Sequence, residues 1–196
     1  HWPKKDEPPG PNGEHLKFNG MVEEMDRQVG KLTAALDRLG LRENTVILFT
    51  GDNGTPTNVT SIMNGRKIKG GKGRLTDAGT RVPLLASWPG TIKAGSINTN
   101  LVDFTDFMPT MAELAGTTVP RDRVIDGQSF VAALKGKNPK PRQWVYTWWS
   151  GKEWLRDKDW KLYADGRLYH MKEDAAEAKP IKKGGDAKAA REKLAG

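Results

Sequence analysis

The chain has 196 residues, no cysteine and a formal net charge of +8 at neutral pH. This length allows one ordinary domain with a real core, although the mean hydropathy of −0.66 is on the polar side. The lack of cysteine excludes disulfides and thiolate chemistry within the chain. No stretch approaches the roughly 20 apolar residues of a membrane span. The positive charge would suit a polyanion, such as nucleic acid or a sulfated glycan, but much of it lies in a lysine-rich end.

The chain starts with His1-Trp2-Pro3 and a Pro- and Gly-rich loop, without a leading Met, so we expect it to be a fragment. Apolar residues then recur at steps of three and four, which predicts an amphipathic helix from about Asn19 to Leu39 with its apolar stripe in the core. Asn19 is the expected N-cap, and Gly40 is the expected C-terminal stop.

A continuous apolar run, Val46-Ile47-Leu48-Phe49, predicts a buried strand of a parallel sheet that is covered on both faces. Asp52 and Asn53 follow it between glycines, where ligand sites of such sheets lie. A carboxylate and an amide oxygen suit Ca²⁺ or Mg²⁺ better than zinc, and the rest of the shell must come from elsewhere. Taken alone, the pair also fits an Asx-rich turn.

Residues 55–79 show little periodicity and contain Lys72 between two glycines. Gly71 and Gly73 allow the backbone to approach an oxyanion, while the ammonium of Lys72 supplies a point charge. The spacing of a P-loop is absent. A flexible basic loop without a bound anion is the alternative.

The next elements are expected to be scaffold. Leu84–Ser87 predicts a second buried strand, and Trp88-Pro89-Gly90 a turn. A helix capped by Asp103 or Thr105 should end at Gly116, and Asp126-Gly127-Gln128-Ser129 should open another that runs through Leu134.

Composition changes at about Arg142. Four short aromatic-rich segments joined by turns predict a small antiparallel meander: Trp144 to Trp149, Trp154 to Arg156, Trp160 to Ala164 and Arg167 to His170. Its aromatic residues either stack on sugars or bases or, as we prefer, form the core of the small sheet. From about Ala175 the Lys-, Ala- and Gly-rich composition predicts a mobile tail that ends in a short helix.

The order of motifs resembles the C-terminal part of a type I sulfatase of the arylsulfatase family, within the alkaline-phosphatase-like superfamily. The resemblance covers about residues 1 to 174 and rests on an ordered set of short motifs. These are His1-Trp2-Pro3, Met25-Asp26-Arg27-Gln28-Val29-Gly30, Asn44-Thr45, Asp52-Asn53-Gly54, Gly71-Lys72-Gly73, Gly79-Thr80-Arg81-Val82-Pro83, Trp88-Pro89-Gly90, Asp106-Phe107-Met108-Pro109-Thr110 and Asp126-Gly127-Gln128-Ser129.

The resemblance implies an α/β fold: the C-terminal part of an alkaline-phosphatase-like doubly wound sheet in residues 1–142, a small antiparallel β subdomain in 143–174, and a Lys/Ala-rich tail in 175–196. It implies a sulfatase that cleaves sulfate monoesters of a sulfated small molecule or glycan. Asp52 and Asn53 would bind Ca²⁺, or alternatively Mg²⁺. Lys72 would contact the sulfate, and His1 the sulfate or the leaving-group oxygen.

The family's nucleophile is a formylglycine made from a Cys/Ser-x-Pro-x-Arg motif, and this motif is absent from the 196 residues. We therefore expect an N-terminal part of the same protein to supply it, and this chain alone to be inactive. Milder departures are Asp77-Ala78-Gly79, where the family has an acidic residue and two glycines, and Gly51 in place of serine. The family further suggests a periplasmic or secreted location and neither a nucleic-acid partner nor a membrane span.

Two other readings remain open from the residues. One is a phosphodiesterase or phosphonate hydrolase of the same superfamily, for which the spare histidines His15 and His170 lack ligand-like spacing. The other is a non-catalytic polyanion-binding module, favoured by the lysine loop and the tryptophans. Asn53 and Asn58 each open a glycosylation sequon, and a glycan on Asn53 would be incompatible with metal binding.

Overall fold

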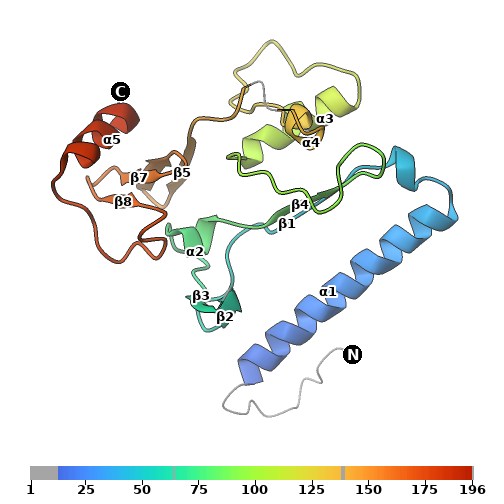
Figure 1. Cartoon of the computed structure of the whole chain (residues 1–196), viewed down its shortest axis with the longest axis horizontal. Helices are drawn as coiled ribbons and strands as arrows, with labels where there is room; N and C mark the ends of the chain where they lie inside the picture. The colour runs from blue at the N-terminus through green and yellow to red at the C-terminus, as the bar shows by residue number, and fades with distance from the viewer. Residues whose placement is uncertain (1–12, 64, 138–139, 196) are drawn as a thin grey trace. The chain divides into compact units, whose positions relative to one another are not determined.

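The computed structural model describes residues 13–63, 65–137 and 140–195 (Figure 1). The chain forms two compact units, one up to Gly90 and one from Thr91 onward. This division lies well before the composition change at Arg142. Within the second unit, an isolated antiparallel bridge joins Leu101 to Arg142. We call the two parts the first unit and the second unit.

The first unit begins with helix α1, Gly13–Arg38. Asn19 lies inside this helix, so the prediction that it is the N-cap is wrong. Gly40 ends the helix as predicted: it has a φ of 68°, and Leu41 N–H donates to the Leu36 carbonyl at 2.9 Å. The apolar stripe is about half exposed, with Leu32 at 53%. The described residues therefore do not cover the stripe that periodicity assigned to a core.

Strand β1, Ile47–Thr50, pairs with β4, Leu84–Ser87. The pairing is antiparallel, with Ile47 opposite Ser87 and Thr50 opposite Leu84. Both strands occur where the sequence predicts them, but β1 is only half-buried and Leu85 of β4 is 62% exposed. A two-stranded ribbon has no further strands or helices over its faces. The full burial predicted for β1 is therefore not seen among the residues described.

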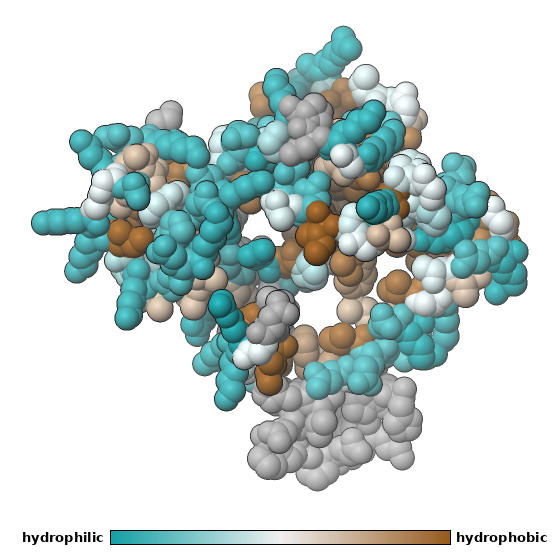
Figure 2. Space-filling model, viewed as in Figure 1, coloured by the Kyte–Doolittle hydropathy of each residue, from teal (hydrophilic) through white to brown (hydrophobic). Residues whose placement is uncertain are grey.

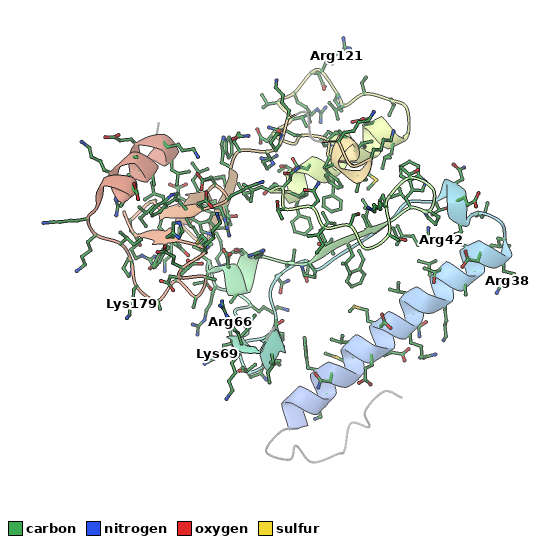
Figure 3. The ribbon with its side chains drawn as sticks, viewed as in Figure 1. Arg38, Arg42, Arg66, Lys69, Arg121 and Lys179 are labelled. Atoms are coloured by element: carbon green, nitrogen blue, oxygen red, sulfur yellow. The ribbon has the colours of Figure 1, made fainter. Side chains whose placement is uncertain are left out.

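A 3₁₀ turn, η1 (Arg42–Asn44), leads from α1 into β1. The indole N–H of Trp88 donates to the Glu43 carbonyl at 3.0 Å and holds the end of β4 to this turn. The region predicted to be irregular contains a hairpin of β2, Thr60–Met63, and β3, Arg66–Lys69, followed by the short helix α2, Asp77–Thr80. Arg66 and Lys69 project from the hairpin (Figure 3). Its polar strands lack the apolar alternation that marks a strand in sequence.

The second unit opens with η2, Phe104–Asp106, α3, Phe107–Leu114, and α4, Val131–Leu134. Asp103 caps η2 as predicted, since its carboxylate accepts the Thr105 N–H at 2.9 Å. Gly116 follows α3 with a φ of 69°, again as predicted.

Asp106 is the centre of this region and is only 2% exposed. Its carboxylate accepts the N–H groups of Asp103 at 2.9 Å and Gln128 at 2.7 Å, as well as the Arg142 Nε–H at 2.9 Å and a second bond from the same guanidinium. The hydrogen bond with Asp106 raises the pKa of Arg142. The motif around Asp106 therefore serves the scaffold, as expected.

Four antiparallel strands follow in the order β5 (Val145–Trp149), β6 (Lys152–Arg156), β7 (Trp160–Tyr163) and β8 (Leu168–His170). They confirm the predicted meander. The last helix, α5 (Gly185–Ala195), packs on this sheet through Ala187, Ala190 and Leu194, which surround Leu168. The predicted short helix at the end of the chain is confirmed, but the prediction that the tail is mobile is wrong, because this helix packs against the sheet.

A buried ion pair fixes the segment between β8 and α5. Lys161 Nζ lies 2.8 Å from Glu177 Oε1, with the two side chains 0% and 1% exposed. The ammonium also lies 4.3 Å from the centre of the Trp154 ring, an arrangement that stabilises a cation in a dry site. Glu177 therefore ties the polar segment after β8 to the sheet.

The space-filling view in Figure 2 shows mainly hydrophilic residues at the surface, in keeping with the polar composition. In the part of the chain that the structure describes, no helix combines the length and the apolar character needed to cross a membrane.

Candidate functional site

The segment that carries Asp52 and Asn53 leaves β1 and meets helix α2. Gly54 N–H donates to the Gly79 carbonyl at 2.9 Å. A Cβ on Gly54 would lie 1.9 Å from the Ala78 carbonyl oxygen, so no other residue fits without moving the backbone. The glycine after Asp-Asn thus allows two backbone segments to touch.

The loop that carries Lys72 is held to the same segment. Lys72 N–H donates to the Thr55 carbonyl at 2.9 Å, and Gly70 N–H to the Val59 carbonyl at 2.8 Å. A Cβ on Gly70 would lie 2.0 Å from the Pro56 carbonyl oxygen. The lysine loop therefore runs directly alongside the chain that follows Asp52 and Asn53.

Helix α2 completes this arrangement. A Cβ on Gly79 would lie 2.1 Å from the Arg74 carbonyl oxygen, and one on Gly71 would lie 2.7 Å from the Ala78 carbonyl carbon. We call Gly54, Gly70, Gly71 and Gly79 the glycine clamp. The clamp joins three segments that are apart in sequence, and it places the Asp-Asn pair and Lys72 in one local structure.

The polar groups of the site are accessible. Asp52 and Lys72 are exposed, and Asn53 is half-buried. Asp52 Oδ1 accepts the Asn53 N–H at 2.9 Å, and Lys72 has no carboxylate partner among the residues whose placement is described. An exposed ammonium without an ion pair can meet an anion at little desolvation cost.

Hard oxygen ligands for a divalent cation are present at Asp52 and Asn53. Across residues 13–63, 65–137 and 140–195, no group of three or more His, Cys, Asp or Glu residues could hold a metal ion. The donor set thus suits Ca²⁺ or Mg²⁺ chemically, with two protein ligands from this segment. His1 lies outside the described residues.

Sequence reasoning named the glycines beside Lys72 but did not identify the clamp. The many glycines that flank the predicted ligands could have indicated close backbone contacts. The sequence does not show which backbone atoms each glycine would meet. Gly51, which replaces a serine of the expected pattern, is not part of the clamp. A Cβ there would meet Val82 at an ordinary 3.6 Å, so a serine side chain would also have room at this position.

Gly54→Ala is expected to lower the free energy of unfolding by about 1–3 kcal/mol, because the new methyl group overlaps the Ala78 carbonyl. The measurement is urea denaturation followed by tryptophan fluorescence. Gly30→Ala is the matched control, since a Cβ at this position of α1 meets nothing within 4 Å and alanine favours a helix. Equal stability of the Gly54→Ala protein and the parent would contradict the clamp.

Comparison with known proteins identifies the family. The sulfatase family model matches residues 3–117, and the model of the C-terminal region of N-sulphoglucosamine sulphohydrolase matches residues 72–195. The steryl-sulfatase of Mus musculus is 38% identical over 128 residues, which are 62% of this chain and 20% of that protein. The chain spans about a fifth of the length of the curated relatives that it matches.

Solved structures agree with the family models. The PsFucS1 sulfatase from Pseudoalteromonas sp. has a TM-score of 0.70 at 29% identity, over 84% of this chain and 38% of that one. A protein solved in complex with its substrate D-glucosamine-2-N,6-O-disulfate has a TM-score of 0.71 at 25% identity, over 89% of this chain and 37% of that one. The fold is thus alkaline-phosphatase-like, and the chain belongs to the sulfatase family.

Proposed function

We propose that this chain supplies the metal-binding and sulfate-binding side chains of a sulfatase, and that the complete protein hydrolyses sulfate monoesters. The observation that carries the proposal is the hydrogen bond between Lys72 N–H and the Thr55 carbonyl at 2.9 Å. Together with the glycine clamp, it holds the backbone of Lys72 beside the segment that follows the two hard oxygen donors, and this supports a shared site. A sulfate ester requires these two kinds of group, because its oxygens carry the negative charge.

Each side chain has a chemical role in this proposal. Asp52 and Asn53 would hold Ca²⁺, or alternatively Mg²⁺, and the bound ion would supply positive charge to the sulfuryl oxygens. Lys72 binds the sulfate and stabilises the charge that develops on its oxygens. The imidazole of His1 protonates the departing alcohol oxygen or contacts the sulfate. A formylglycine supplied from outside these 196 residues is the proposed nucleophile.

The proposed substrate is a sulfated small molecule or a sulfated glycan. The related protein solved with a disulfated glucosamine supports a sugar substrate, and the relatives named steryl-sulfatase support a steryl sulfate. Exposed basic residues of the β2–β3 hairpin, such as Arg66 and Lys69, add a positive field that suits either (Figure 3). We further propose a periplasmic or secreted location.

Asp52→Asn in the complete protein tests the metal part of the proposal. Loss of the carboxylate charge is expected to raise the Ca²⁺ concentration for half-maximal activity about tenfold, because charge count sets the affinity of such sites. The measurement is hydrolysis of an aryl sulfate during Ca²⁺ titration after chelation. Asp37→Asn, which changes an exposed carboxylate on α1, should titrate like the parent. An unchanged Ca²⁺ response in Asp52→Asn would contradict the assignment.

A further inference from the structure

The lysine loop presents two cations from one tight turn. Arg74 N–H donates to the Gly71 carbonyl at 2.8 Å, which closes a four-residue turn over residues 71–74. Gly73, the third residue of the turn, has a φ of 78°, as a type II turn requires at this position. Lys72 is the second residue and Arg74 the fourth. Because their Cα atoms are two residues apart, they lie at most about 7 Å from each other.

The backbone of Arg74 is held on both sides by the glycine clamp. Its N–H is bonded to Gly71, and its carbonyl oxygen lies so close to Gly79 that a Cβ there would be 2.1 Å away. The side chain of Arg74 is exposed, and it forms no ion pair within the part of the chain that the structure describes. A charged group on a fixed backbone can bind a partner at the cost of ordering its side chain alone.

The clamp itself does not require an arginine at this position. Both contacts of Arg74 with the clamp are made by backbone atoms, which every residue except proline provides. Alanine would therefore be held equally well, and the guanidinium is available for another role. The competing partner is an acidic side chain elsewhere in the complete protein. Such an ion pair would contribute to stability and would affect every substrate alike.

The chemistry of the guanidinium suits an oxyanion. It is planar and always charged, and its paired N–H donors match two oxygens of a carboxylate or a sulfate. We propose that Arg74 is a specificity-determining residue, which binds a second oxyanion of the substrate next to the sulfate held by Lys72. This inference rests on the proposed function, because that function places the cleaved sulfate at Lys72. The protein then prefers sulfate esters that carry a further sulfate or a carboxylate.

The test is steady-state hydrolysis of phenyl sulfate, meta-carboxyphenyl sulfate and resorcinol disulfate by the complete protein. The kcat/KM of each dianionic substrate is divided by that of phenyl sulfate, and this ratio is compared between variant and parent, so that differences in leaving-group reactivity cancel. Arg74→Ala is expected to lower the ratio about tenfold, the usual effect of losing hydrogen bonds to a charged group. The substrate with the larger loss identifies the second oxyanion as a carboxylate or a sulfate.

Two further variants sharpen the comparison. Arg74→Lys keeps the charge but lacks the planar fork, so its ratio should lie between those of Arg74→Ala and the parent. Arg38→Ala is the matched control, because it removes an exposed arginine from the end of α1 in the same unit (Figure 3). It should keep the ratio of the parent.

An equal loss for all three substrates in Arg74→Ala, or no loss for any of them, would overturn the proposal. An equal loss together with a lower melting temperature would assign Arg74 to an ion pair elsewhere in the protein. If Lys72→Ala reduces hydrolysis of all three substrates while Arg74→Ala leaves the ratios unchanged, this inference fails and the proposed function stands. The reverse result would keep Arg74 as a substrate-binding residue and refute the role proposed for Lys72.

Discussion

Lys72→Ala in the complete protein is expected to reduce kcat/KM for an aryl sulfate by about 10²- to 10³-fold, the usual effect of removing one group that stabilises developing charge. Lys72 is exposed, and its backbone N–H is fixed to the Thr55 carbonyl at 2.9 Å. The side chain can therefore leave without a change in the clamp. The measurement is steady-state hydrolysis, with the stability of each variant determined by thermal denaturation.

Lys69→Ala is the control for this prediction, because it removes the same charge from an exposed position on β3, three residues away. It should change kcat/KM by a few-fold at most, through weaker attraction of the anionic substrate. A comparable loss in both variants would show that Lys72 contributes general positive charge and has no specific contact with sulfate. Full activity of the Lys72→Ala protein would show that Lys72 is not part of the sulfate-binding site.

Arg142→Met is expected to lower the free energy of unfolding by about 3–5 kcal/mol, because it leaves the Asp106 carboxylate buried without its cation. The pair is almost fully enclosed, with side chains 6% and 3% exposed. Asp106 also accepts backbone N–H groups from Asp103 and Gln128, so it cannot turn toward solvent without breaking them. The measurement is equilibrium denaturation in urea.

Arg123→Met provides the comparison for the buried pair. Arg123 and Asp122 form an ion pair at 2.9 Å, but their side chains are 65% and 68% exposed. Water screens this pair, so its loss should leave the unfolding curve unchanged. If Arg142→Met behaved like Arg123→Met, the Asp106 region would not be the organising centre of the second unit.

Local sequence determined many of the helices and strands and the family to which the chain belongs. The apolar run before Asp52 predicts β1, Gly40 predicts the end of α1, and the aromatic segments with their turns predict the four-stranded sheet. Apolar runs that form strands, glycines that end helices and tight turns each depend on a few adjacent residues. They can therefore be predicted without knowledge of contacts distant in sequence. The order of short motifs, too, is a property of the chain alone, and it predicted the sulfatase family that the comparisons confirm.

Tertiary structure decided which residues meet. The glycine clamp depends on carbonyl oxygens up to 25 residues away from Gly54 in sequence, as with its hydrogen bond to Gly79. Arg142 finds Asp106 across 36 residues, and Glu177 lies in a polar segment that composition marks as mobile. Helical spacing puts Ala187, Ala190 and Leu194 on one face of α5, but this face is buried because it packs against sheet residues such as Leu168. Such pairings are set by the desolvation and close packing of groups distant in sequence, which composition and periodicity do not encode.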